Sequence, residues 1–162
     1  MRREITQLFW ETYCVLHIGW DPNKDPEIKL DPSGGFHQFS HTDPQELLRH
    51  CAERSRAPTA LYKSLEVLSG RAGLLKRGAL GAGPSTKMLA SSIKDTKTKL
   101  EEIVLDMLNQ LYVLATSLDI TINVLRREEH EGIRERSLDL LESVNTRILR
   151  LIRLRERLNK RI

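Results

Sequence analysis

The sequence has few cysteines and few aromatic residues, and both shortages narrow the class of protein. Its 162 residues include only Cys14 and Cys51, too few for a disulfide framework and more typical of a reducing compartment. Aromatic residues make up 5% of the chain, against 40% hydrophobic and 30% charged residues. Helical bundles and coiled coils have this leucine-rich, charge-rich composition, so we expect an all-α fold.

Long apolar segments are also missing. Arg2 and Arg3 are followed at once by acidic and polar residues, which leaves no apolar core for a signal peptide. No uninterrupted apolar run approaches the ~18 residues of a membrane-spanning helix. We therefore expect an intracellular protein, cytoplasmic or nuclear, with no membrane span.

Local signals divide the first 42 residues into a helix and a loop. The apolar spacing from Ile5 to Ile18 predicts an amphipathic helix, although its aromatic and β-branched residues leave a strand open, and Gly19 is a plausible stop. Three Asp-Pro pairs and a Ser-Gly-Gly sequence then predict an irregular loop over 20–42, with room for a short strand at 27–30. Loops of this length are usually functional or disordered.

The next segment reads as two helices and a linker. Thr42-Asp43-Pro44 predicts a capped helix start, and Pro58 predicts a break or kink after Ser55. A second helix is expected from Thr59 to Lys76, followed by glycines that predict a flexible linker. We therefore expect an N-terminal helical region at 1–77, a glycine-rich linker at 78–85 and a helical part at 86–162.

The C-terminal part predicts a long antiparallel helical hairpin, bundle or coiled coil. One helix is expected from Ser85 or Thr86 to about Arg127, and a second from Ile133 to the end, with a polar turn at Glu128–Gly132 between them. About forty helical residues reach ~60 Å, longer than an ordinary globular helix. The sequence leaves open whether this hairpin closes within one chain or pairs between chains.

Apolar residues at helical spacing define the expected packing interface of the hairpin. In the last helix, an a/d heptad pattern runs through Leu141 and Leu158, with Arg155 at one a position, and further apolar residues outside it favour a bundle over an isolated coil. We expect this interface to mediate self-association, giving a homo-oligomer, or binding of a helical partner. Its central residues are Leu100, Ile103, Met107, Leu111, Leu114, Leu118, Leu141, Val144, Ile148 and Leu151.

Each motif that resembles a catalytic or nucleotide-binding site is incomplete, so we expect neither an enzyme nor a bound cofactor. The run Gly78–Gly83 resembles the start of a phosphate-binding loop, but Pro84 and Ser85 stand where lysine and serine or threonine are needed. The cysteines and histidines lack a local nucleophile signature. Neighbouring carboxylates such as Glu101 and Glu102 diverge around a helix and read as solvated surface.

Zinc is the alternative that the first third of the chain leaves open. Cys14 with His17, and His37 with His41, have spacings that a structural zinc site could use, but no Cys-x2-Cys pair is present. The alternative without a metal is that the cysteines are buried apolar residues and the histidines face solvent. A small zinc-stabilised adaptor is therefore the third functional hypothesis.

The C-terminus is strongly basic, within a chain of net charge +4 and pI about 9.2. Cations near a helix C-terminus favour the helix macrodipole, which explains the pattern without a ligand. The functional interpretation is contact with an acidic partner, phosphate or nucleic acid. Aromatic residues are absent there, which disfavours single-strand recognition by stacking. The basic residues are Arg147, Arg150, Arg153, Arg157, Lys160 and Arg161.

Most aromatic residues lie before residue 40, and Trp10, Tyr13 and Trp20 are the candidates among them for a partner hot spot. The alternative is that they pin the loop onto a small core. The leading hypothesis is a non-enzymatic helical interaction or scaffold protein, part of a homo-oligomer or a larger complex. The runner-up is an accessory protein that binds nucleic acid or phosphate through its basic residues.

Overall fold

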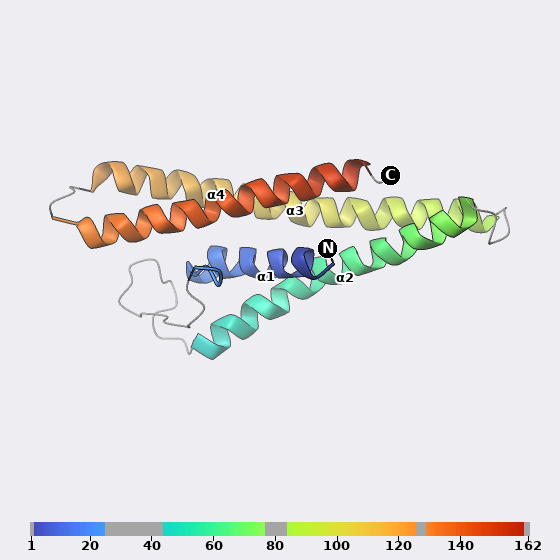
Figure 1. Cartoon of the computed structure of the whole chain (residues 1–162), viewed down its shortest axis with the longest axis horizontal. Helices are drawn as coiled ribbons and strands as arrows, with labels where there is room; N and C mark the ends of the chain where they lie inside the picture. The colour runs from blue at the N-terminus through green and yellow to red at the C-terminus, as the bar shows by residue number, and fades with distance from the viewer. Residues whose placement is uncertain (1, 25–43, 77–83, 126–128, 161–162) are drawn as a thin grey trace.

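Over the residues that it describes, the computed structural model is an all-α structure of four helices (Figure 1), which confirms the predicted fold class. It describes residues 2–24, 44–76, 84–125 and 129–160. The helices are α1 (Arg2–Ile18), α2 (Pro44–Lys76), α3 (Pro84–Val124) and α4 (Glu131–Lys160). The short strand and the loop expected within 20–42 lie mostly outside the described residues.

Gly19 ends α1, as the sequence predicts. Its φ is 61°, in the left-handed region that favours glycine, and its N–H donates to the carbonyl of Val15 at 3.2 Å. Asp21 then accepts a hydrogen bond from the backbone N–H of Asn23 at 3.0 Å through Oδ1. This tight turn points the chain back toward α4.

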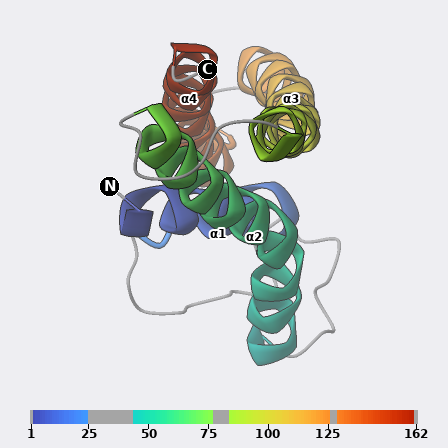
Figure 2. The same ribbon diagram turned by 90° about the vertical axis from the view of Figure 1, so that its right-hand side faces the viewer.

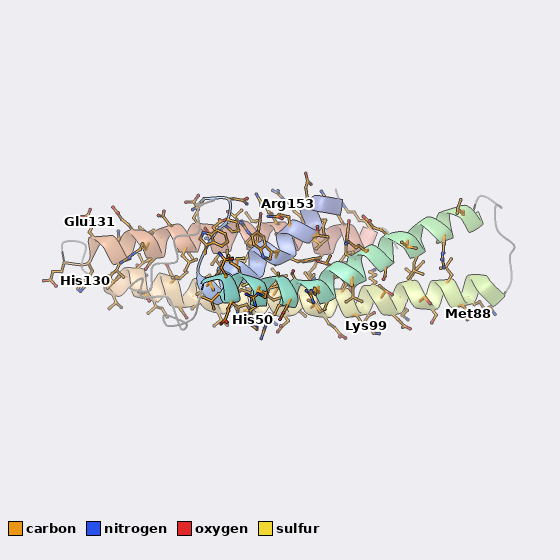
Figure 3. The ribbon with its side chains drawn as sticks, turned by 90° about the horizontal axis from the view of Figure 1, so that it is seen from below. His50, Met88, Lys99, His130, Glu131 and Arg153 are labelled. Carbon is orange, nitrogen blue, oxygen red and sulfur yellow. The ribbon has the colours of Figure 1, made fainter. Side chains whose placement is uncertain are left out.

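Pro58 does not divide α2 into two helices, so the predicted helix start at Thr59 is wrong. The helix continues through Pro58, and Figures 2 and 3 show that it changes direction along its length. Proline removes one backbone hydrogen bond and crowds the preceding turn, which bends a helix without ending it when packing holds both halves. Both halves of α2 have buried side chains, Leu47 and Cys51 before Pro58 and Tyr62 and Leu65 after it.

Helices α3 and α4 form the predicted antiparallel hairpin, and it closes within one chain (Figure 1). The 41 residues of α3 make it about 60 Å long. All ten residues of the predicted interface are buried or partly buried. Leu100 and Leu111 of α3 and Val144 and Leu151 of α4 are completely buried.

The buried seam of α4 differs in part from the predicted one. Leu141 and Arg155 of the predicted heptad are only partly buried. The buried heptad shares Val144, Leu151 and Leu158 with the predicted one, is buried at each position, and includes a charged residue. Its members are Leu140, Val144, Arg147, Leu151, Leu154 and Leu158.

The two N-terminal helices cover one side of the hairpin. Viewed end-on in Figure 2, α3 and α4 form one layer and α1 and α2 the other. One continuous hydrophobic core joins both layers, so the described parts of the predicted N-terminal region and hairpin pack as a unit. Residues 77–83, most of the predicted linker, lie outside the described residues. The end of the hairpin where α3 leads to α4 extends beyond α1 (Figure 1), and the opposite side of α3 carries no described helix.

Candidate interaction surfaces

A buried ion network joins α4 to α1 and to the turn that follows α1. Arg147 is 1% exposed, and its Nη2 lies 2.7 Å from Asp21 Oδ1 and 3.2 Å from Glu11 Oε2. Glu11 and Asp21 are buried as well. Two carboxylates facing one guanidinium satisfy the pairing that buried charges need. Arg147 was predicted as a partner contact, but it lies inside the folded chain.

Neighbouring charges complete this network. Arg150 Nη1 lies 3.7 Å from Glu11 Oε2, so two guanidinium groups balance two carboxylates. Lys24 donates from Nζ to the carbonyl of Asp139 at 3.2 Å and pairs with Glu142 at 3.1 Å. These contacts fasten the turn at 19–24 onto α4 at two points along the helix.

A groove of about 630 Å³ lies between α1 and α4, next to this network. Ile5, Leu8 and Leu154 give it an apolar floor. Arginines at positions i, i+3 and i+7 of α4 form one wall, and Arg153 is labelled in Figure 3. The groove has the size of a small-ligand site, and its cationic wall suits a carboxylate or phosphate. The polar lining residues are Glu4, Gln7, Glu11, Asn23, Arg150, Arg153 and Arg157.

The structure therefore separates the six predicted basic residues. Arg150, Arg153 and Arg157 line the groove, and Lys160 is exposed at the end of α4. Arg161 lies outside the described residues.

The aromatic residues predicted as a hot spot are packed into the core. Tyr13 and Trp20 are buried, and Trp10 is partly buried. The rings of Trp10 and Trp20 meet edge to face with their centroids 6.1 Å apart, a favourable arrangement for aromatic pairs. These contacts hold the turn after α1 against that helix.

The predicted zinc ligands are only partly described. Cys14 and Cys51 are free, buried thiols in the contact between α1 and α2. Their mutual hydrogen bond and burial raise the pKa of Cys14, whereas that hydrogen bond lowers the pKa of Cys51. Within the described residues, no group of three or more histidines, cysteines or acidic residues is placed to hold a metal ion. His37 and His41 lie outside them.

His17 lies one turn after Cys14, at the edge of the same contact. Its ring stacks on Tyr13 at 5.7 Å, and its Nε2 accepts from Arg54 Nη1 at 3.5 Å. Burial, with the nearby Arg54 and His50, lowers the pKa of His17. The neutral imidazole is therefore the form that the folded chain favours.

An exposed apolar face of α3, missed by the sequence analysis, lies on the side away from the core. We call it the α3 outer stripe. Packing inside the chain leaves these five side chains 44–74% exposed. The sequence signal was the absence of charge from Met107 to Leu118, which a search for a buried seam alone overlooks. The stripe consists of Leu105, Tyr112, Val113, Ile120 and Val124.

The first half of α3 has a different outer face. Lys94, Asp95, Lys99 and Glu102 are exposed there, as on an ordinary solvated helix (Figure 3 labels Lys99). By length and composition alone, the part of α3 from Lys87 to Val124 is also apolar enough to cross a membrane, and 28% of its most apolar window is buried in the fold. Core helices of soluble proteins pass the same test, so this is weak support for a membrane span.

Replacing Arg147 by alanine is expected to destabilise the fold by about 3–5 kcal/mol, because Glu11 and Asp21 would stay buried without their cation. Arg153→Ala is the control, because Arg153 is exposed on the same helix and takes part in neither of these ion pairs, so its loss should change stability by under about 0.5 kcal/mol. Urea unfolding followed by circular dichroism measures both. Equal stability of the two variants would contradict a structural role for the network.

His17 is expected to make stability pH-dependent. Since its pKa is lowered in the folded chain, its contribution is present above the unfolded value of about 6.5 and is lost as pH falls through the folded pKa. The free energy of unfolding should therefore fall less between about pH 7 and pH 5.5 in His17→Gln than in the wild type. Parallel pH profiles for the two proteins would show that His17 makes no such contribution.

No protein-family model, curated protein or solved structure matches this chain. Any proposal about its function therefore rests on its own residues and their geometry.

Proposed function

We propose that this chain is a non-enzymatic interaction protein that binds a helical partner through the α3 outer stripe. The observation that carries the proposal is the exposure of five large apolar side chains on one side of one helix. Single exposed apolar residues are normal, but a contiguous apolar patch on a folded protein marks an interaction site.

The stripe has the geometry of a helix-packing surface. Successive residues turn about 100° around a helix, so Leu105, Tyr112, Val113 and Ile120 fall within an arc of about 100°. An apolar arc of this width is what an amphipathic helix presents to a neighbouring helix. Asn109 and Thr116 are exposed between these residues and offer hydrogen bonds that fix the register of a partner.

Polar residues on α3 favour a protein partner over lipid. Asn109, Asp119 and Asn123 are exposed along the same half of the helix. Burying such groups in hydrocarbon is costly, whereas a protein partner can satisfy them. The outer face of α4 also carries polar residues, with Glu135, Glu142 and Asn145 exposed.

The direct test is Val113→Asp, because Val113 is 67% exposed and its replacement leaves the core intact. We expect any assembly formed by the chain to weaken by about tenfold or more, with unchanged helicity. Thr98→Asp adds the same charge to an exposed position on the first half of α3 and should have no effect. Native mass and cross-linking of the intact chain, alone and in cell extract, measure assembly. Equal behaviour of both variants would exclude the stripe as an interaction surface.

A second candidate function is binding of nucleic acid or another phosphate-containing ligand at the groove between α1 and α4. The three arginines along one wall favour it, and the carboxylates of the opposite wall oppose it. Phosphate contacts by arginine make affinity fall steeply with salt concentration.

For this candidate, Arg153→Glu should weaken binding of short duplex DNA by about tenfold and flatten its salt dependence. Arg136→Glu, an exposed arginine of α4 outside the groove lining, is the matched control and should have a smaller effect. Fluorescence anisotropy at several salt concentrations measures both. If both variants lose affinity equally, the binding reflects net charge and the groove is not the site.

A further inference from the structure

We infer that the partner of the α3 outer stripe is a second copy of this chain, packed antiparallel about a two-fold axis between Tyr112 and Val113. This inference rests on the proposed function and names its partner. It is based on the order of apolar and polar residues along the exposed side of α3.

That order reads the same from both ends. Along the middle of the stripe from Leu105 to Ile120, apolar and polar positions alternate, with Asn109 and Thr116 as the polar ones and the pair Tyr112 and Val113 at the centre. The other exposed polar residues of this span lie at the edges of the stripe, and they are Asp106, Ser117 and Asp119. Leu105 and Ile120 are equally far from the point between Tyr112 and Val113, and so are Asn109 and Thr116. The part of the stripe from Leu105 to Ile120 is therefore symmetric in chemical character about that point, and Val124 lies outside this symmetric part.

A symmetric stripe is what an antiparallel pair of identical helices requires. In a two-fold interface each contact occurs twice, with residue i against residue j of the second copy and j against i. Leu105 then packs against Ile120 of the second copy, and Asn109 lies opposite Thr116 of the second copy. The central Tyr112 and Val113 meet across the axis. Apolar layers cover apolar layers, and the amide and hydroxyl groups meet each other, so neither is buried without a hydrogen-bonding partner.

The charges that flank the stripe favour the antiparallel direction. A parallel, in-register pair would place Glu102 against Glu102 and Asp106 against Asp106, and like charges opposite one another are destabilising. The antiparallel pair instead places Glu102 near Asn123 of the second copy. The antiparallel pair also puts Asp106 level with Asp119 of the second copy, but the two positions differ by about 140° around the helix and therefore lie on opposite edges of the stripe. The carboxylate of Asp106 is also held by Gln110, whose Nε2 donates to it at 2.8 Å.

The outer face of α4 fits a second copy less well. Its exposed apolar residues between Ile133 and Lys160 are Ile133, Leu138 and Leu149, and charged residues separate them. The stripe on α3 is therefore the surface on the hairpin that two copies can share with the least burial of charge.

The size of the stripe sets the expected strength of the pair. From Leu105 to Ile120 the helix is about 24 Å long and offers a strip about 10 Å wide. This is smaller than the ~800 Å² per partner that stable complexes bury. The pair should therefore be a weak dimer whose population rises with protein concentration.

The test exchanges one apolar layer for a designed ion pair. Leu105→Lys alone and Ile120→Glu alone should each raise the dissociation constant of the dimer by about tenfold or more, since each puts an unpaired charge in the apolar layer. The double variant L105K/I120E should recover to within about threefold of the wild type, because both ends then carry a Lys–Glu pair. The control L105K/I120K has the same number of new charges without opposite signs and should stay monomeric. Sedimentation of the intact chain over a range of concentrations measures all five proteins.

Each outcome decides the inference. Recovery in L105K/I120E but not in L105K/I120K supports the antiparallel register. A wild-type dimer whose double variant does not recover overturns that register. A wild type that stays monomeric throughout, or that binds only lipid vesicles, overturns pairing with a second copy. In the monomeric case the proposed function still stands if Val113→Asp disrupts assembly with another protein, and it fails with the inference if Val113→Asp changes nothing.

Discussion

The buried pairing of Arg147 with Glu11 and Asp21 is the interaction on which the arrangement of this protein depends. Taking three charges out of water is costly, and the cost is offset only when all of them meet in good geometry. That requirement ties α1 and the turn at 19–24 to one position along α4. Removing one member would leave the other charges buried without a partner, so the network holds these elements in position.

This constraint decides which surface of the hairpin remains free. Helix α1 is fixed on α4, and α2 packs on α1 and α3. Both N-terminal helices therefore cover the same side of the hairpin. The opposite side of α3 keeps its apolar residues exposed, although the same helix supplies Leu100, Leu111 and Leu118 to the core. One helix thus has two apolar faces, and only one of them is covered by the described chain. The second face is the basis of the proposed interaction.

Periodicity predicted the features that one helix or one turn determines. The helix from Ile5 to Ile18 and the stop at Gly19 follow from local spacing, and the structure contains both. The apolar residues predicted for the hairpin interface also follow from spacing, but they are buried or partly buried in the core of a single chain, so their predicted role in self-association remains a prediction. The course of α2 through Pro58 depends on packing of both its halves, which the proline signal alone does not contain. Arg147 was predicted to be a surface cation because it belongs to a cluster of basic residues, and its position on the helix was not considered. Yet it shares heptad spacing with Val144 and Leu151, and that spacing was the available signal for its burial. The α3 outer stripe was not predicted, because the expected buried seam accounted for only one of the two apolar faces of this long helix.

Light scattering after size exclusion, on the wild-type chain at increasing concentration and at low and high salt, tests the central claim most directly. Packing of two apolar stripes predicts a mass that rises from monomer toward dimer with concentration and changes little with salt, since apolar contacts are not screened. A mass that stays at the 18.6 kDa of one chain at every concentration would contradict it. So would an association that disappears at high salt, because charge rather than the apolar stripe would then hold the copies together.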